Sequence, residues 1–462
     1  MATNKTCDTT DRLADDMSMG AVENACVVHP HIQNSPSGLG RDATSMLNEI
    51  VNLTGAIGLN VAIAEIIKLT KPHPGQLFGK GQTERITDHI HNHNINGLGG
   101  PIKVVVVNGV MTPIQQRNLE KSWDCKVIDR TGLILEIFGE RAQTKEGRLQ
   151  VELAALSYQR GRLVRSWTHL ERQRGGAGFM GGPGERQIET DRRLIAERIT
   201  ALKSKLIDVK RTRQLHRRAR KRVPFPMVAF VGYTNAGKST LFNTFTNSGV
   251  VAKDLLFATL DPTMRRLDLP SGRTVILSDT VGFISNLPHE LVNAFRATLE
   301  EVIEADLIVH LQDAAHPECE AQKRDVEQVL AQLNIPDFGP KKLINAYNKV
   351  DLLDGNQKLF VDNIVDRSPR DTVIISAVNG DGLPKLLDLI DDKITATFVT
   401  QNHTLEYADG AGLAWFYENG DVISRTDDEK GIHLSVRLSQ THAHRLEGLQ
   451  KSQAKSKAKK SN

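Results

Sequence analysis

A glycine-rich segment beginning at Gly232 has the residue types and spacing of a phosphate-binding loop. Gly232 and Gly237 are followed by Lys238 and Ser239 in the order G-x-x-x-x-G-K-S, between the apolar run 227–231 and an apolar helix start. This strand, loop and helix context is the one the motif requires. Glycines let backbone N–H groups face anionic oxygens, Lys238 can reach the β and γ phosphates, and the Ser239 hydroxyl can complete a magnesium shell. We therefore expect a triphosphate site that uses Mg²⁺.

A second pair of motifs predicts the base. Asn348-Lys349-Val350-Asp351 follows a β-type run about 110 residues after the loop, and Ser376-Ala377 stands at another strand end. The Asp351 carboxylate can accept hydrogen bonds from both N1–H and the amino group of guanine, whereas adenine lacks this pair of donors. Because a buried carboxylate left unpaired is penalised, the pattern favours guanine nucleotides.

Two further segments are candidates for sensing the γ phosphate. Asp279-Thr280-Val281-Gly282 follows the apolar strand 274–278, so Asp279 could hold magnesium through water and the Gly282 N–H could contact the γ phosphate. The segment 257–261 supplies Thr259 as a possible magnesium ligand. Chemically similar alternatives to Thr259 are Thr234, Thr240 and Thr263.

The predicted site residues form one set. The predicted GTP-binding residues are Gly232, Tyr233, Thr234, Asn235, Ala236, Gly237, Lys238, Ser239, Phe257, Ala258, Thr259, Leu260, Asp261, Asp279, Thr280, Val281, Gly282, Asn348, Lys349, Val350, Asp351, Ser376, Ala377 and Val378. The predicted catalytic residues are Lys238, Gly282 and Thr259, and the predicted metal ligands are Ser239 and Thr259, with Asp279 acting through water. Phe283 stands where many switch GTPases have a water-orienting glutamine, which predicts slow hydrolysis without a partner.

The scaffold that must position these residues is predicted to be an α/β domain with a mainly parallel sheet. The prediction rests on the alternation of strands with helices from residue 223 to about 400. Helical stretches at 47–69 and 82–91 alternate with β-type runs at 102–107 and 126–128, which predicts a smaller N-terminal α/β domain. Short runs at 413–417 and 433–438 predict strands of a small C-terminal α+β module. The predicted parts are a flexible extension (1–42), an α/β domain (43–140), a basic helical hairpin (141–222), a GTPase domain (223–400), a small domain (401–450) and a basic tail (451–462).

Charge is concentrated in the predicted hairpin. Residues 141–222 hold 22 lysine or arginine and 8 aspartate or glutamate, a net charge of +14, whereas the chain of 462 residues carries +4. Two apolar stripes at helical spacing predict its two helices. This asymmetry favours a polyanionic partner, with a solvated helix face as the alternative. The glycine-rich segment 174–184 between the helices is either a hinge or a tip loop that approaches another surface, and both interpretations remain open.

Composition excludes several classes of protein. Hydrophobic residues are 39% and charged residues 25%, as in ordinary globular chains, so neither wholesale disorder nor a fibrous repeat is expected. No apolar run approaches the roughly 20 residues that span a bilayer, and residues 1–20 do not resemble a secretory signal. The four cysteines lack metal-like spacing. We expect a cytoplasmic protein that is a monomer when free.

The assembled motifs resemble the HflX family of GTPases over residues 45–400. The resemblance rests on Gly79-Lys80-Gly81, Gln115 to Leu119, Asp129 to Leu135, Gln150 to Leu153, Pro183 to Glu185, Glu189 to Arg193, Phe257 to Thr263, Asp279 to Ile284 and Leu287-Pro288-His289. Arg186, where the family pattern usually has threonine, and an extra glycine in segment 174–184 depart from it. The resemblance implies a cytoplasmic GTPase that binds GTP and GDP, associates with the large (50S) ribosomal subunit and its RNA, and splits, rescues or recycles ribosomes.

The residues themselves leave one alternative open and argue against another. One is an RNA-binding or RNA-remodelling protein for which nucleotide serves only as an allosteric ligand. The other is a metabolic P-loop kinase, for which the Asn348 to Asp351 and Ser376-Ala377 segments would have no purpose.

Overall fold

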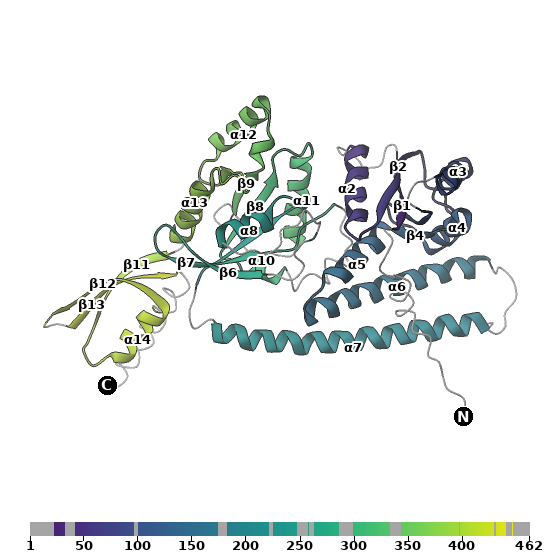
Figure 1. Cartoon of the computed structure of the whole chain (residues 1–462). Coiled ribbons are helices and arrows are strands. Elements are labelled where there is room, and N and C mark those ends of the chain that lie inside the picture. Colours follow the sequence, from purple (N-terminus) through teal and green to yellow (C-terminus); the bar gives the residue numbers. More distant parts are fainter. Residues whose placement is uncertain are drawn as a thin grey trace. The chain divides into compact units, whose positions relative to one another are not determined.

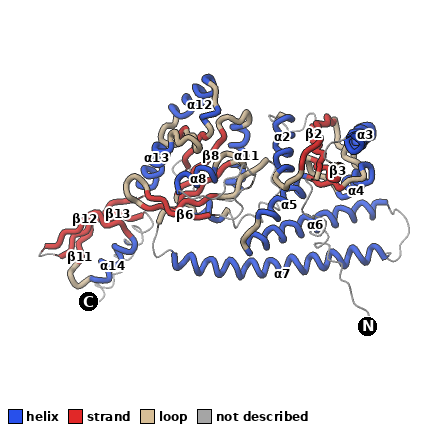
Figure 2. The backbone as a smooth tube through the Cα atoms, viewed as in Figure 1, coloured by secondary structure: helices blue, strands red, loops and turns tan. Residues whose placement is uncertain are grey.

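The computed structural model describes residues 23–32, 42–96, 100–173, 183–220, 225–246, 257, 263–285, 299–332, 343–396, 398–428, 431–439 and 446. The chain divides into two compact units, and each is described by itself. One unit contains Met1–Ile137 and Arg165–Gly175, and the other contains Phe138–Val164 and Gly176–Asn462. Within them the backbone forms three separate sheets and two long helices (Figures 1 and 2). No helix in the described ranges is both long and apolar enough to cross a membrane.

The first sheet has four parallel strands in the order β2-β1-β3-β4. Its strands are β1 (Asn24–Ile32), β2 (Asn60–Leu69), β3 (Ile102–Val107) and β4 (Lys126–Asp129). Its helices are α2 (Ala43–Gly55), α3 (Lys80–Asn96), α4 (Pro113–Trp123) and α5 (Arg130–Arg141). On one face, buried Val28 and Val105 pack with Ile86 of α3 and Leu119 of α4. A capping box between Thr112 and Gln115 fixes where α4 begins.

Two long helices follow, α6 (Lys145–Gln173) and α7 (Pro183–Arg220), which lie side by side (Figure 1). Arg198 of α7 forms an ion pair with Glu152 of α6 at 2.8 Å. Leu202, one residue of the predicted apolar stripe, is buried on α7. This arrangement confirms the predicted helical hairpin.

The second sheet has six strands in the order β10-β9-β8-β5-β7-β6, of which only β6 runs antiparallel to its neighbour. Its strands are β5 (Met227–Gly232), β6 (Thr263–Asp268), β7 (Thr274–Asp279), β8 (Leu307–Asp313), β9 (Leu343–Asn348) and β10 (Thr372–Ile374). Its helices are α8 (Lys238–Thr246), α10 (Glu300–Glu304), α11 (Cys319–Gln332), the 3₁₀ helix η3 (Val350–Leu352), α12 (Gly355–Arg367) and α13 (Leu383–Ala396). This is the mainly parallel α/β domain predicted from the sequence.

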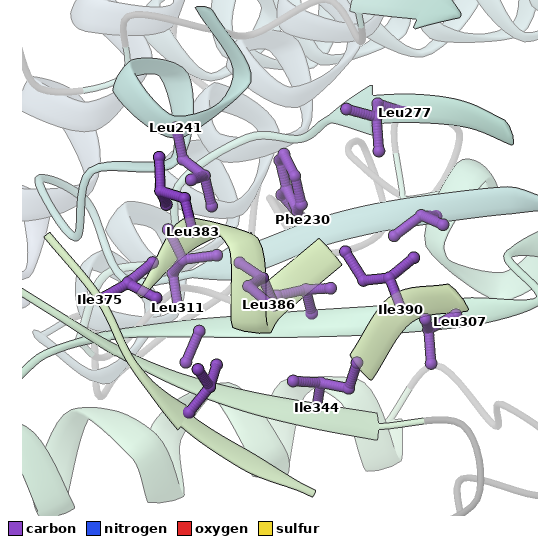
Figure 3. Packing of buried hydrophobic residues seen from close by; sticks show 14 of the residues in the cluster. Phe230, Leu241, Leu277, Leu307, Leu311, Ile344, Ile375, Leu383, Leu386 and Ile390 are labelled. Carbon is purple, nitrogen blue, oxygen red and sulfur yellow. The ribbon is translucent and has the colours of Figure 1, made fainter. Parts of the chain in front are cut away.

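The core of this domain lies between one face of the sheet and helices α8 and α13 (Figure 3). Phe230 and Leu311 from the strands pack in one cluster with Leu241 of α8 and Leu386 of α13. Each fully buried side chain of this kind contributes about 1.5 to 3 kcal/mol relative to exposure. The core therefore holds the carboxyl ends of β5, β7, β8 and β9 in fixed positions at one edge of the sheet.

The third sheet is antiparallel, in the order β11-β13-β12. Its elements are β11 (Phe398–Leu405), α14 (Gly410–Asn419), β12 (Gly420–Asp428) and β13 (Gly431–Ser439). Phe416 of α14 packs on Leu434 and Val436 of β13. The predicted small α+β module is therefore present.

Three predicted elements are wrong. The extension 1–42 was expected to lack a fold, but residues 24–32 form β1, whose backbone groups pair with β2 on one side and β3 on the other. The predicted helix 47–69 ends at Gly55, and its second half is strand β2. The predicted strand 413–417 is helical, because α14 begins at an Asp409 cap that accepts from the Gly412 N–H. Elsewhere, the exact domain boundaries stay a prediction.

Several predicted features lie outside the described residues. They are the segment 174–182, Lys221, Arg222, the tail 451–462 and Cys7. The hairpin ends in a basic cluster predicted to contact a polyanion: Lys210, Arg211, Arg213, Arg217, Arg218, Arg220, Lys221 and Arg222. Within this cluster the helical backbone is described to Arg220, and the Arg211 side chain is exposed. The three described cysteines, Cys26, Cys125 and Cys319, are free thiols.

Candidate functional site

The loop after β5 lies where the sheet order reverses. β5 pairs with β7 on one side and β8 on the other, and such a reversal is where open α/β sheets bind ligands. The carboxyl ends of these strands carry Gly232, Asp279 and Asp313, and β9 next to them ends at Asn348. Residues far apart in the sequence therefore meet at one edge of the sheet.

The loop has the backbone shape of an anion cradle that opens into α8. Gly237 has φ of +92°, and a Cβ atom built there would lie 2.2 Å from the Asn348 side-chain nitrogen. No other residue fits this position without displacing Asn348. Asn235 also has a left-handed backbone, with φ of +62°. The loop leads directly into the start of α8 at Lys238, where a helix N-terminus favours negative charge.

Lys238 provides the positive charge of the cradle. Its side chain is buried, and Nζ donates to the carbonyl oxygens of Gly232 at 3.1 Å and Tyr233 at 2.8 Å. Burial lowers the pKa of this amine to about 8, while the Asp279 carboxylate opposes the shift. A phosphate group would offer this ammonium stronger acceptors than the two carbonyls.

Ser239 and Asp279 bring together oxygen atoms that suit a magnesium ion. The Ser239 hydroxyl donates to Oδ2 of Asp279 at 2.8 Å, and Asp279 is buried at the end of β7. Hydroxyl and carboxylate oxygens are ligands that Mg²⁺ accepts, usually with several waters. The donor chemistry therefore fits the predicted ion. The other predicted ligand, Thr259, lies outside the described residues, as do Ala258, Leu260 and Asp261.

Asn348 joins the predicted base-binding loops to the phosphate-binding loop. Its side-chain nitrogen donates to the Ala236 carbonyl at 2.8 Å, and its side-chain oxygen accepts from the Ala377 N–H at 2.9 Å. On the base side, the Ser376 hydroxyl donates to Oδ1 of Asp351 at 2.6 Å, which fixes the orientation of that carboxylate. The structure thus brings together the two predicted groups of residues through one buried amide.

Asp313 belongs to this site and was missed by sequence reasoning. Its Oδ2 atom lies 2.8 Å from Nζ of Lys349, and both side chains are largely buried. Lys349 itself has a left-handed backbone, with φ of +66°, so the ion pair holds a side chain whose backbone is already constrained. A signal existed, since Asp313 is an acidic residue at the end of the β-type run 307–313, but only the pairing of β8 with β9 shows its partner.

The segment after β7 runs alongside the phosphate-binding loop. The Phe283 N–H donates to the Gly232 carbonyl at 3.1 Å, and the Thr234 N–H donates to the Phe283 carbonyl at 2.8 Å. Beyond them, the Ser285 N–H donates to the phenolic oxygen of Tyr233 at 2.6 Å. The Thr280 hydroxyl donates a hydrogen bond to the Phe230 carbonyl on the neighbouring strand β5. Buried Phe283 offers no side-chain hydrogen bond at this point.

Two further predicted residues, Phe257 and Val378, differ in their burial. Phe257 is buried with φ of +56°, and its ring meets the ring of Phe138 edge to face at 4.7 Å. Val378 is 78% exposed beside the Ser376-Ala377 segment, so it is available to cover a bound base.

His310, buried on β8, has a pKa lowered to about 3 by burial and by the neighbouring charges of Lys323 and Lys238, and it is therefore neutral. No sequence pattern singles out His310.

Comparison with known proteins covers most of the chain. Four family models match, described as GTP-binding GTPase N-terminal (residues 44–139), GTP-binding GTPase Middle Region (141–220), 50S ribosome-binding GTPase (227–349) and HflX C-terminal domain (364–460). GTPase HflX of Magnetococcus marinus is 48% identical over 88% of this chain and 91% of its own length. GTPase HflX of Lacrimispora saccharolytica is 41% identical over 87% and 91%.

One solved structure, of a protein named SsGBP in complex with GDP, aligns with 80% of this chain and 98% of its own at 22% identity and a TM-score of 0.47. The sequence relatives are far more similar and span nearly the whole described chain. The four matched regions also occur in the order in which the three sheets and the hairpin follow one another. The chain belongs to the HflX family of P-loop GTPases.

Proposed function

We propose that this protein binds GTP with Mg²⁺ at the site described above and couples hydrolysis of GTP to the splitting, rescue or recycling of ribosomes. The observation that carries the nucleotide part is the amide of Asn348, which holds the phosphate-binding loop and the Asp351 loop in one hydrogen-bonded unit. Such a unit fits a ligand that has a triphosphate at one end and guanine at the other. We further propose that the protein acts in the cytoplasm as a monomer.

The chemistry assigned to the chain is positioning and charge stabilisation, which dominate phosphoryl transfer. Lys238 would neutralise the β and γ phosphates, and the N–H of Gly282 would contact the γ phosphate. Ser239 and, through water, Asp279 would hold the magnesium ion, which neutralises charge that develops on the phosphates. The predicted contribution of Thr259 would add to the same ion.

The position after Gly282 supports a requirement for a partner. Phe283 is buried and its side chain has no group that could orient an attacking water. A surface that orders the site could supply the missing positioning. We therefore propose that the large ribosomal subunit completes the catalytic site.

The basic hairpin supports ribosomal RNA as the contact. Residues 141–222 carry a net charge of +14, and α7 extends to Arg220 within the cluster. Phosphate contacts by lysine and arginine are non-specific in sequence and strongly salt-dependent. The name of the family model over 227–349, 50S ribosome-binding GTPase, points in the same direction.

A GTPase assay with and without purified 50S subunits tests this proposal. We expect slow hydrolysis by the free protein and at least about a tenfold increase with subunits, which is about 1.4 kcal/mol of barrier. A free protein that already hydrolyses as fast as the subunit-bound form would contradict the proposed completion of the site.

Light scattering of 70S ribosomes tests the ribosomal role. Intact protein with GTP should split them, whereas a variant lacking residues 175–184 should still pellet with 50S subunits but fail to split 70S ribosomes. Lys238→Ala serves as the control, because it removes the ammonium proposed to neutralise the β and γ phosphates during GTP hydrolysis. Normal splitting by Lys238→Ala would favour an RNA-remodelling protein for which nucleotide hydrolysis is dispensable.

A further inference from the structure

The phenol of Tyr233 makes a contact that the proposed chemistry does not use. Tyr233 is the residue after Gly232 in the phosphate-binding loop, yet its hydroxyl oxygen accepts a hydrogen bond from the Ser285 N–H at 2.6 Å. Both residues are buried, with relative exposures of 6% and 1%. The contact therefore joins a side chain of the phosphate-binding loop, that of Tyr233, to the backbone of the segment that follows Gly282.

Backbone hydrogen bonds to the phosphate-binding loop hold the first residue of that segment. Phe283 is fixed by its own N–H to Gly232 and by its carbonyl to Thr234. Ser285 lies two residues further along, and the structure describes the chain only that far before the next described residue, Leu299. The Tyr233 hydroxyl thus extends the contact between the segment and the loop to Ser285.

We infer that Tyr233 is a positioning residue for recognition of the γ phosphate. By holding Ser285, it keeps the backbone around Gly282 beside the ammonium of Lys238. A Cβ atom built at Gly282 would lie 3.2 Å from Nζ of Lys238 and 2.8 Å from Cγ2 of Thr234, so this backbone is already close to the predicted position of the γ phosphate. This inference rests on the proposed binding of GTP at Lys238.

Removal of the Tyr233 hydroxyl would leave the Ser285 N–H without this acceptor. The Ser285 N–H is buried, and without its acceptor the segment must either leave that donor unpaired or move to pair it elsewhere. Either change loosens Gly282 relative to Lys238. The β phosphate is bound by the loop backbone and by Lys238, which the change leaves intact, so GDP should not sense the loss.

Tyr233→Phe tests this separation because it removes only the hydroxyl. Affinities for fluorescent GDP and for a fluorescent non-hydrolysable GTP analogue would be measured, together with kcat at saturating GTP. We expect the GDP affinity to stay within about twofold, and the affinity for the GTP analogue and kcat each to fall by about tenfold, the scale set by one buried unpaired amide.

Tyr347→Phe is the matched control. Tyr347 is a buried tyrosine on β9 of the same sheet, and burial together with the charges of Glu320 and Glu327 of α11 raises the pKa of its phenol. Its hydroxyl makes no hydrogen bond to any residue in the described ranges. We expect this variant to bind both nucleotides and to turn over like the unaltered protein.

The outcomes separate this inference from the proposed function. Equal loss of GDP and GTP-analogue binding in Tyr233→Phe would show that the hydroxyl only supports the loop, and no change in either would show that the contact has no role; each result overturns the inference. Failure of the unaltered protein to bind guanine nucleotides would instead contradict the proposed function. Thermal melting of both variants confirms that they are folded.

Discussion

The side-chain nitrogen of Asn348 lies 2.8 Å from the carbonyl oxygen of Ala236, although the two residues are 112 positions apart in the chain. Its side-chain oxygen accepts from the Ala377 N–H. The buried amide of Asn348 therefore uses both its donor and its acceptor, and it connects its own loop with the loops that contain Ala236 and Ala377. Any ligand that organises one of these loops therefore acts on the other two. This relationship determines how the site should respond to substitution.

Asn348→Ala should disconnect the loops. The Ala236 carbonyl and the Ala377 N–H would each lose a buried partner, at about 1 to 3 kcal/mol for each unpaired group. We expect a lower free energy of unfolding in denaturant titration and at least tenfold weaker binding of both GDP and GTP. Asn363→Ala, at an exposed position of α12 where the side chain bonds only the Leu359 carbonyl, should change the stability by less than about 0.5 kcal/mol. Unaltered nucleotide binding by Asn348→Ala would show that the loops are held independently.

Asp351→Asn should move the base preference from guanine to xanthine. The Asn side chain can donate to the C2 oxygen of xanthine, where the carboxylate needs donors from guanine. Ser376 should still orient the side chain, because its hydroxyl can donate to the amide oxygen as it does to Oδ1 of Asp351. Competition between GTP and XTP in the hydrolysis assay measures the change. If the variant kept its preference for GTP, Asp351 would be a turn residue with no part in base recognition.

Asp313→Asn should weaken GDP and GTP binding equally. Lys349 would keep its constrained backbone but lose the carboxylate that holds its ammonium at 2.8 Å, and a partly buried charge without its partner is costly. We expect about three- to tenfold weaker binding in calorimetry, with the ratio of GTP to GDP affinity unchanged. Asp362→Asn, at a half-buried position of helix α12, is the control. A change confined to GTP would mean that Asp313 acts on the γ phosphate instead.

Nucleotide affinity should depend on pH through Lys238. The pKa of its amine in the free protein is lowered to about 8 by burial, and bound phosphates favour the charged form, so the pKa rises on binding. Binding then requires proton uptake above pH 8. Affinity for GDP should be flat below about pH 7.5 and should fall as the pH rises past 8, by up to tenfold per unit.

Fluorescence titrations between about pH 7 and 9 measure this slope. Lys238→Arg is the control, since a guanidinium stays charged over the whole range and any remaining binding should lose the dependence. A slope that persists in Lys238→Arg would assign the titration to another group. No slope in the unaltered protein would mean that Lys238 is fully charged before the nucleotide binds.

The site could be predicted where its residues are consecutive in the sequence. The loop 232–239 and the segment 348–351 carry their chemistry in short motifs, and the structure brings the two together at one edge of the sheet. The roles assigned to their residues stay a prediction. Asp313 and the contact between Tyr233 and Ser285 could not be found in this way, because they depend on which strands are neighbours and on their register.

The fold class could also be predicted, but two strands of the N-terminal sheet could not. Residues 60–69 place Ala62, Ile63, Ile66 and Ile67 at spacings that suit a helix as well as a strand, and pairing with β1 decides the outcome. Residues 24–32 are a nine-residue strand with a proline and two histidines, so their local preference for a strand is weak. Their structure comes from partners up to about 80 positions away, which no local pattern records.

The position of β1 has a consequence for shortened forms of the protein. The family match to the N-terminal region begins at residue 44, yet β1 ends before it and lies between β2 and β3. A chain cut at residue 44 would leave β2 and β3 about 10 Å apart, twice the normal spacing of neighbouring strands, with two facing edges unpaired. Such edges recruit strands from other molecules. An expression fragment chosen by the family boundary is therefore expected to aggregate.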